Sequence, residues 1–180
     1  MTDTITDTSA IFKFNLNKYF FDDINKPSCF SWDRMTTTST TKDTYKILLL
    51  SKCLGSEGIY TDMLDSNHCL KHSEDGTLLF DNASYQEVAF TNYSPDINLV
   101  YNSLVDSETN VGVLGFTLSV NNDLFTLELP STDNYVKAMI LYNDRTKYMM
   151  AYTILDDNLV LHNLQHIPMS GGLISVSEIS

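Results

Sequence analysis

Two cysteines and two histidines come closest to a metal-binding set in this chain. Sulfur and imidazole ligands suit zinc, and four of them can close a tetrahedral site. The spacing argues against one, because there is no Cys-x-x-Cys pair and two of the residues are adjacent and would point to opposite sides of a strand. We therefore expect a polar loop with one buried thiol, and no metal or other cofactor. The four residues are Cys53, His68, Cys69 and His72.

Other titratable pairs are also weak candidates for a site. His162 and His166 share a face only if their segment is helical, and the surrounding sequence is more typical of strand and loop. Acidic pairs at predicted turns offer oxygen ligands to calcium but lack the spacing of an EF-hand loop. We expect solvated turn carboxylates, with calcium as the alternative. These pairs are Asp22 with Asp23, Asp62 with Asp65, and Asp156 with Asp157.

The sequence contains no catalytic motif. It has neither a Gly-x-Ser-x-Gly elbow nor a Gly-rich phosphate loop. A cysteine nucleophile needs a histidine beside it in space, and a small buried thiol is the simpler interpretation. We expect a protein without enzymatic activity. A hydrolase using paired acids is a remote third hypothesis, because such acids must be positioned in a cleft.

The charge of the chain argues against two classes of partner. Its 180 residues include 23 Asp and Glu against 11 Lys and Arg, giving a formal net charge of -12. Such a chain repels the phosphates of nucleic acids and the surfaces of anionic membranes, so we expect neither as a partner. It suits a basic protein partner or cations. The length allows one domain with a substantial core.

The cysteines and the N-terminus indicate a compartment. Cys29, Cys53 and Cys69 are odd in number and irregularly spaced, which is no disulfide framework. We expect free thiols in a reducing environment. The first residues are acidic where a signal peptide is basic, and no stretch has the length of a transmembrane helix. A soluble or assembled component is therefore expected.

The best-defined element is a hairpin between residues 134 and 155. Two apolar runs rich in Val, Ile, Thr and Tyr flank a polar tip, and this is the composition of two strands and a turn. The first run is apolar at every position from Ala138 to Leu141, which predicts a strand covered on both faces. Asn143, Asp144 and Arg145 at the tip are at most a surface contact.

Short apolar segments recur along the rest of the chain. Residues 59–64 predict a helical turn or a short strand, and Ser94-Pro95-Asp96 predicts the start of a short helix, with a strand as the alternative. The turn residues 121–123 predict a second hairpin between their flanking strands. Many short strands favour an all-β, antiparallel β-sandwich, jelly-roll or immunoglobulin-like, with at most one short helix. The two-residue strand period is seen at residues 12–17, ahead of an aromatic cluster at 19–21, and further strands are expected at residues 45–50, 77–80, 85–90, 111–120, 124–129, 159–164 and 173–179.

The first 32 residues are interpreted as an N-terminal extension. A Thr-rich linker, residues 33–44, separates them from the predicted sandwich at residues 45–180. The apolar side chains of the extension must be buried, either on its own domain or on another subunit. We favour a docking arm. Its predicted partner-binding residues are Phe12, Phe14, Leu16, Tyr19, Phe20, Phe21, Phe30 and Trp32.

Three strand sequences suggest a relationship. The run DTYKILLL at residues 43–50, the run NYVKAMILY at 134–142 and the answering strand at 148–154 resemble those of a group of small tailed-bacteriophage virion proteins. The similarity covers roughly residues 43–179, judged from strand order and spacing. It implies a compact β domain and carries no catalytic residues.

The resemblance defines the leading functional hypothesis. It implies a structural protein of a tailed bacteriophage, in the role of a capsid decoration, neck, tail or fibre-attachment component. Such a protein is made in the host cytoplasm, docks on other virion proteins and is a homo-oligomer in the particle. The alternative is a receptor- or carbohydrate-binding β-sandwich module that uses exposed Tyr, Asp and Asn side chains.

Overall fold

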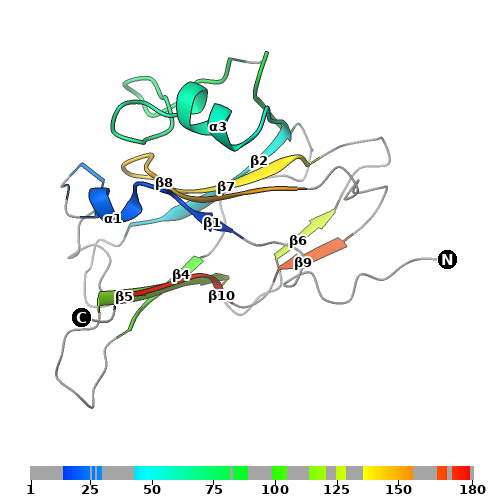
Figure 1. Cartoon of the computed structure of the whole chain (residues 1–180). Coiled ribbons are helices and arrows are strands. Elements are labelled where there is room, and N and C mark those ends of the chain that lie inside the picture. Colours follow the sequence, from blue (N-terminus) through cyan, green and yellow to red (C-terminus); the bar gives the residue numbers. More distant parts are fainter. Residues whose placement is uncertain are drawn as a thin grey trace.

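Figure 1 shows a computed structural model of the chain. It describes residues 14–24, 26, 28–29, 43–81, 83–88, 99–104, 114–120, 125–128, 136–155, 166–169 and 172–178; in the ranges 99–128 and 166–178 only the backbone is described. The strands are β1 (Asn15–Leu16), β2 (Tyr45–Lys52), β3 (Gln86–Glu87), β4 (Leu99–Leu104), β5 (Leu114–Val120), β6 (Phe125–Glu128), β7 (Ala138–Asn143), β8 (Met149–Ile154), β9 (His166–Met169) and β10 (Gly172–Glu178). Three short helical elements accompany them: α1 (Phe20–Asp23), α3 (Ser56–Gly58) and the π-helix η2 (Ile59–Met63).

The largest sheet has five antiparallel strands in the order β1-β8-β7-β2-β3. The predicted hairpin is confirmed as β7 and β8, which pair from Ala138 opposite Ile154 to Tyr142 opposite Met149. Every side chain of β7 is buried, as its unbroken apolar run predicts. The hairpin therefore forms the middle of this sheet.

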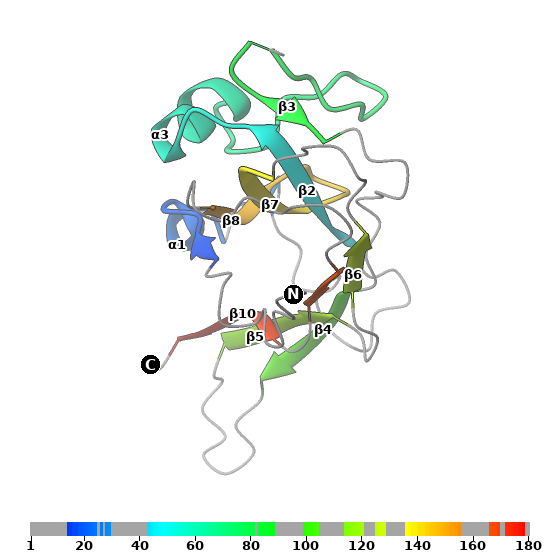
Figure 2. The ribbon, with the colours of Figure 1, turned by 90° about the vertical axis from the view of Figure 1, so that its right-hand side faces the viewer.

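The core lies between this sheet and the helices that cover it. Leu48 and Leu50 of β2 pack with Ile140 of β7 and with Ile59 and Met63 of η2. Figure 1 shows α3 above the sheet, and Figure 2 shows the same layer from the side. Of the two structures left open for residues 59–64, the helical turn is the one that forms.

Two smaller sheets complete the described structure. One has three antiparallel strands in the order β10-β5-β4, and the other pairs β6 with β9. In Figures 1 and 2 the three-stranded sheet lies on the side of β7 and β8 opposite to α3. The predicted all-β class is confirmed, since strands dominate and the helices are short. The closing strand is at an edge, as predicted.

Three local predictions are corrected. The helix expected after Ser94 is wrong where residues are described, because Leu99–Leu104 form β4, the strand that was the alternative. Val100 and Tyr101 favour a strand and outweigh the helix-start signal at 94–96, which lies outside the described residues. The second hairpin is also wrong, since β5 and β6 belong to different sheets. Residues 77–80 contribute one bridge, His72 with Leu78, instead of a strand. The strand expected at 159–164 lies outside the described residues.

Candidate functional site

Residues 14–29, here called the N-terminal segment, are joined to the five-stranded sheet in their described part. Strand β1 pairs with β8, and the Asn17 side-chain amide donates to the carbonyl of Met149 at 2.9 Å. One turn later α1 brings Phe20 to full burial. The described part of this segment therefore packs on the sheet; residues 33–42 of the predicted linker lie outside the described residues, and the predicted division of the chain stays a prediction.

Asp23 is the centre of the contacts that fix the segment. Its carboxylate is fully buried and accepts hydrogen bonds from Lys26 Nζ at 2.6 Å and from the Tyr148 hydroxyl at 2.9 Å. His68 Nδ1 lies 2.6 Å from Oδ2, the same carboxylate oxygen that accepts the Tyr148 hydroxyl. Burial raises the pKa of Asp23, but the hydrogen bonds from Lys26, His68 and Tyr148 outweigh burial and hold that pKa below its usual value. We call these four residues the Asp23 network.

A constrained turn positions His68 for this contact. His68 has a φ of 61°, in the left-handed region that non-glycine residues seldom occupy. Its amide donates to the carbonyl of Asp65 at 3.0 Å, and the Asp65 carboxylate accepts the amides of Asn67 at 2.8 Å and Cys69 at 3.1 Å. The imidazole is stacked on Tyr19, with ring centroids 4.0 Å apart and planes at 6°. The turn therefore places the His68 imidazole against two residues of the N-terminal segment, Asp23 and Tyr19.

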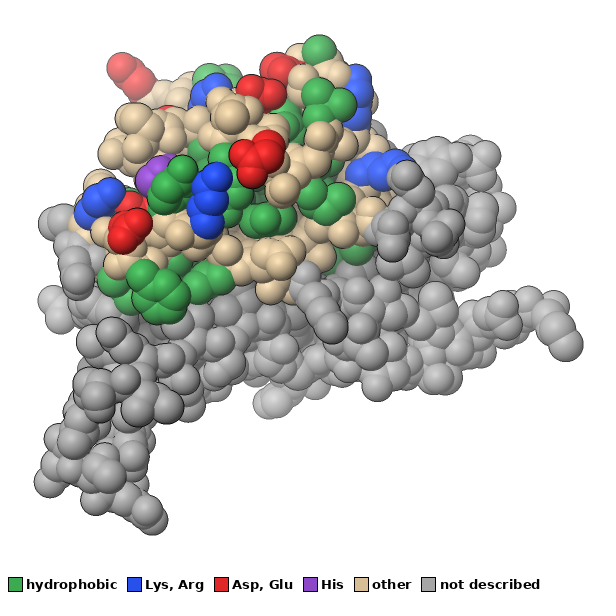
Figure 3. All heavy atoms as spheres, in the orientation of Figure 1, with side chains coloured by type: hydrophobic (Ala, Val, Ile, Leu, Met, Phe, Trp, Pro, Cys, Tyr) green, Lys and Arg blue, Asp and Glu red, His purple; other side chains and the backbone are tan. Residues whose placement is uncertain are grey.

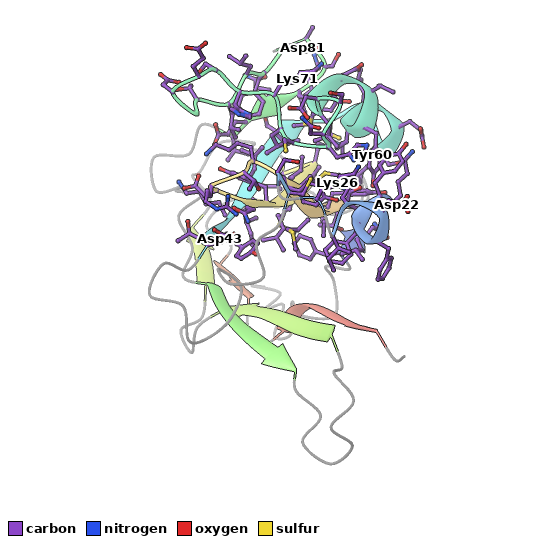
Figure 4. All side chains as sticks on the ribbon, turned by 90° about the vertical axis from the view of Figure 1, so that its left-hand side faces the viewer. Asp22, Lys26, Asp43, Tyr60, Lys71 and Asp81 are labelled. Carbon is purple, nitrogen blue, oxygen red and sulfur yellow. The ribbon has the colours of Figure 1, made fainter. Side chains whose placement is uncertain are left out.

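An aromatic cluster extends this contact to the surface. Tyr60 of η2 meets Tyr19 and Tyr152 edge to face, at centroid distances of 5.8 and 5.9 Å. Lys18 Nζ lies 4.3 Å from the centre of the Tyr60 ring, and the Lys18 amide donates to the Tyr60 hydroxyl at 3.0 Å. In Figure 4 Tyr60 lies near Asp22 and Lys26, on the side that carries α1. The cluster joins the N-terminal segment, η2 and β8.

The predicted docking residues divide into buried and exposed positions. Phe20 is fully buried in the fold, whereas 60 % of Phe21 is exposed. Phe14, Leu16 and Tyr19 are half-buried. Figure 3 shows hydrophobic side chains between acidic and basic ones on one face of the described part. Phe12, Phe30 and Trp32 lie outside the described residues.

The hairpin tip is built for structure more than for contact. Asn143 is fully buried, which corrects its expected place on the surface. Its side chain donates to Asp43 at 3.0 Å and accepts the amides of Arg145 and Thr146, because a turn here needs those amides bound. The Arg145 guanidinium binds Asp43 with two hydrogen bonds, of 2.6 and 3.0 Å. Asp144 is half-buried and bound to Lys147 at 2.8 Å.

The four residues considered as a zinc set, which the sequence argued against, have separate contacts in the described structure. His68 contacts Asp23, His72 contacts the Leu70 carbonyl at 2.7 Å, and Cys53 lies 3.9 Å from the Gly55 carbonyl. Among the described residues no three His, Cys, Asp or Glu side chains are grouped to hold a metal ion. His166 lies on a strand, as the sequence suggested for its surroundings.

Sequence reasoning missed the Asp23 network. Two of its members are far from Asp23 in the sequence: His68 lies 45 positions away and Tyr148 lies 125 positions away. The available signal was the acidic pair that follows the run Tyr19-Phe20-Phe21, since an acid beside a buried aromatic cluster needs donors; its second member, Asp23, was expected to be solvated and is fully buried.

The comparisons with known proteins give no family. No protein-family model matches the sequence, and neither a curated protein nor a solved structure is significantly similar to the chain. In the part of the chain that the structure describes, no helix has the length and apolar character needed to cross a membrane.

Proposed function

We propose that this chain is a non-enzymatic structural protein that binds other proteins through its N-terminal segment. The assembly is the virion of a tailed bacteriophage, with the chain as a capsid-decoration, neck or tail component in several copies. Support comes from the strand sequences at residues 43–50 and 134–154, which resemble those of such proteins. A net charge of -12 suits a protein partner with a basic surface.

The contrast between Phe20 and Phe21 carries this proposal. Phe20 is fully buried and its neighbour Asp23 is held by three side chains, so α1 has a fixed position. Phe21 extends from this fixed turn with 60 % of its surface exposed. A large aromatic side chain on a rigid support loses little conformational entropy on binding, and this is the character of an interface anchor.

We propose a β-sandwich as the architecture behind this role. The five-stranded sheet supplies one layer, and the three-stranded sheet on the side opposite to α3 supplies the other (Figure 2). Such a sandwich presents α1 at one end of the larger sheet. Phe12, also a predicted docking residue, lies outside the described residues.

The test compares two single substitutions in assembled particles. Phe21→Ser removes the exposed aromatic, and Leu54→Ser removes another apolar side chain, one that is 66 % exposed in the loop between β2 and α3. Each variant replaces the wild-type chain during assembly, and the amount in purified particles is measured by mass spectrometry. We expect at least a tenfold loss for Phe21→Ser, which is worth about 1.4 kcal/mol, and no loss for Leu54→Ser. Equal incorporation of both variants would refute the docking role.

Point substitutions serve better than removal of the first 32 residues. That deletion also removes Phe20 and Asp23, and it leaves the buried Tyr148 hydroxyl without its carboxylate acceptor. A truncated chain could then fail to assemble because it is unfolded. Phe21→Ser leaves the hydrogen bonds of Asp23 in place and removes only the edge-to-face contact of its ring with Phe20.

A receptor- or carbohydrate-binding module is the second candidate. The half-buried rings of Tyr19 and Tyr60, with Lys18 beside them, resemble the mixed aromatic and polar surfaces that recognise such ligands. A glycan array probed with wild-type and Tyr60→Ala protein tests this role. Binding by wild type alone would support it, and the absence of binding to any glycan would favour the structural role.

A further inference from the structure

Two of the three cysteines lie beside the same backbone carbonyl. The sulfur of Cys29 is 3.7 Å from the Asn67 carbonyl oxygen, and the sulfur of Cys69 is also 3.7 Å from it. The two sulfurs are therefore separated by no more than twice that distance. Cys29 belongs to the N-terminal segment, and Cys69 follows the turn that carries His68.

Each cysteine of this pair makes a backbone contact within the described residues. Cys29 donates its amide to the Lys26 carbonyl at 2.9 Å and is fully buried. Cys69 pairs with Tyr148 in an isolated antiparallel β-bridge of the backbone and is 5 % exposed. Both are free thiols, and a disulfide between them requires the sulfurs to approach from at most twice 3.7 Å to a bond length of about 2 Å.

We propose that Cys29 and Cys69 are an oxidisable pair that a peroxide converts into an intramolecular disulfide. The bond would link the N-terminal segment covalently to the turn at residues 65–69, next to the Asp23 network. Cys53 lies apart, with its sulfur 3.9 Å from the Gly55 carbonyl, and takes no part. The inference stands independently of the proposed docking function.

The reaction has two balanced steps. One sulfur, as its thiolate, attacks a peroxide oxygen; the O–O bond breaks, hydroxide leaves and takes up a proton as water, and the sulfur becomes a sulfenic acid. The second thiol loses its proton and attacks that sulfur, the S–O bond breaks and a second water leaves. Two thiols are oxidised and one peroxide is reduced to water.

The surroundings of the pair make this reaction slow at neutral pH. Burial raises the pKa of the Cys29 thiol. Burial, followed by the negative charge of Asp65, raises the pKa of Cys69 to about 12. Because the thiolate is the reactive form, the rate of disulfide formation should increase as the solution becomes more alkaline.

The experiment treats the full-length folded protein with hydrogen peroxide, blocks the remaining thiols by alkylation and maps the peptides by mass spectrometry. We expect the wild type to lose two hydrogen atoms and to yield a peptide pair joined through Cys29 and Cys69, with Cys53 alkylated. Cys53→Ser is the matched control and should form the same bond. Cys29→Ser and Cys69→Ser should form none, and a dithiol reductant should reverse the reaction in the wild type.

Three results would overturn the inference. They are a bond that includes Cys53, oxidation to sulfinic acid without any disulfide, and a Cys29–Cys69 bond that forms only in urea. The comparison with urea matters because an unfolded chain can join any two thiols. Circular dichroism of the serine variants before oxidation establishes that they are folded.

Discussion

The Tyr148 hydroxyl donates a 2.9 Å hydrogen bond to the carboxylate of Asp23, across 125 positions of sequence. Tyr148 lies at the start of the second arm of the central hairpin, and Asp23 ends α1 in the N-terminal segment. Both side chains are fully buried. This contact makes the N-terminal segment part of the same unit as the hairpin, and it places the exposed Phe21 on a fixed support.

Tyr148→Phe is predicted to lower the free energy of unfolding by about 1.5–3 kcal/mol, the range for a hydrogen bond to a charged group. Tyr85→Phe is the matched control. Tyr85 is also buried, but its hydroxyl has no hydrogen-bond partner among the described residues. Its removal should leave stability unchanged or raise it. Urea unfolding of both variants checks the pair, and equal losses would contradict the role given to the Tyr148 hydroxyl.

Gly58→Ala is predicted to destabilise the wild-type protein by about 1–3 kcal/mol, because a methyl group there overlaps the Tyr85 hydroxyl. The backbone itself accepts alanine, since Gly58 has ordinary helical angles of φ -64° and ψ -31°. The same change in a Tyr85→Phe background should therefore cost little or even stabilise the helix. A double-mutant cycle by urea unfolding measures this coupling, and purely additive effects would exclude the overlap.

The stability contributed by Asp23 should depend on acid pH. Its pKa is lower in the folded protein than in the unfolded chain, where an aspartate has a pKa of about 3.9. The folded state therefore binds a proton less readily, and this contribution is complete above the unfolded pKa and lost as the pH falls through the folded value. Urea unfolding of wild type and Asp23→Asn from neutral to acid pH checks the sign. Their difference should shrink on acidification, and a difference that widens would contradict it.

Local sequence patterns predicted the centre of the fold. The apolar run at residues 45–50 and the hairpin around Asn143 have strand composition and turn chemistry within a few positions, and both form as expected. The pairing of β5 and β6 with other strands was not predictable in this way, because pairing depends on which sheets the rest of the chain can complete.

The candidate site was less predictable than the fold. Aromatic residues at positions 19–21 indicated that the N-terminal segment must be buried somewhere, but not where. The answer depends on hydrogen bonds to Asp23 from residues 45 and 125 positions away. Asn143 was also misplaced, because a polar residue at a turn is expected to be exposed. It is buried instead, where its side-chain amide donates a hydrogen bond to Asp43.

The most direct test of the fixed N-terminal segment is amide hydrogen exchange. The backbone amide of Asn17 donates to the Met150 carbonyl at 2.9 Å, and the backbone amide of Ile24 donates to the Phe20 carbonyl at 2.9 Å. We predict that both amides are protected in the wild type and lose protection selectively in Asp23→Asn, while the amides of β7 keep theirs. Exchange of Asn17 and Ile24 in the wild type at the rate of an unstructured peptide would contradict the account.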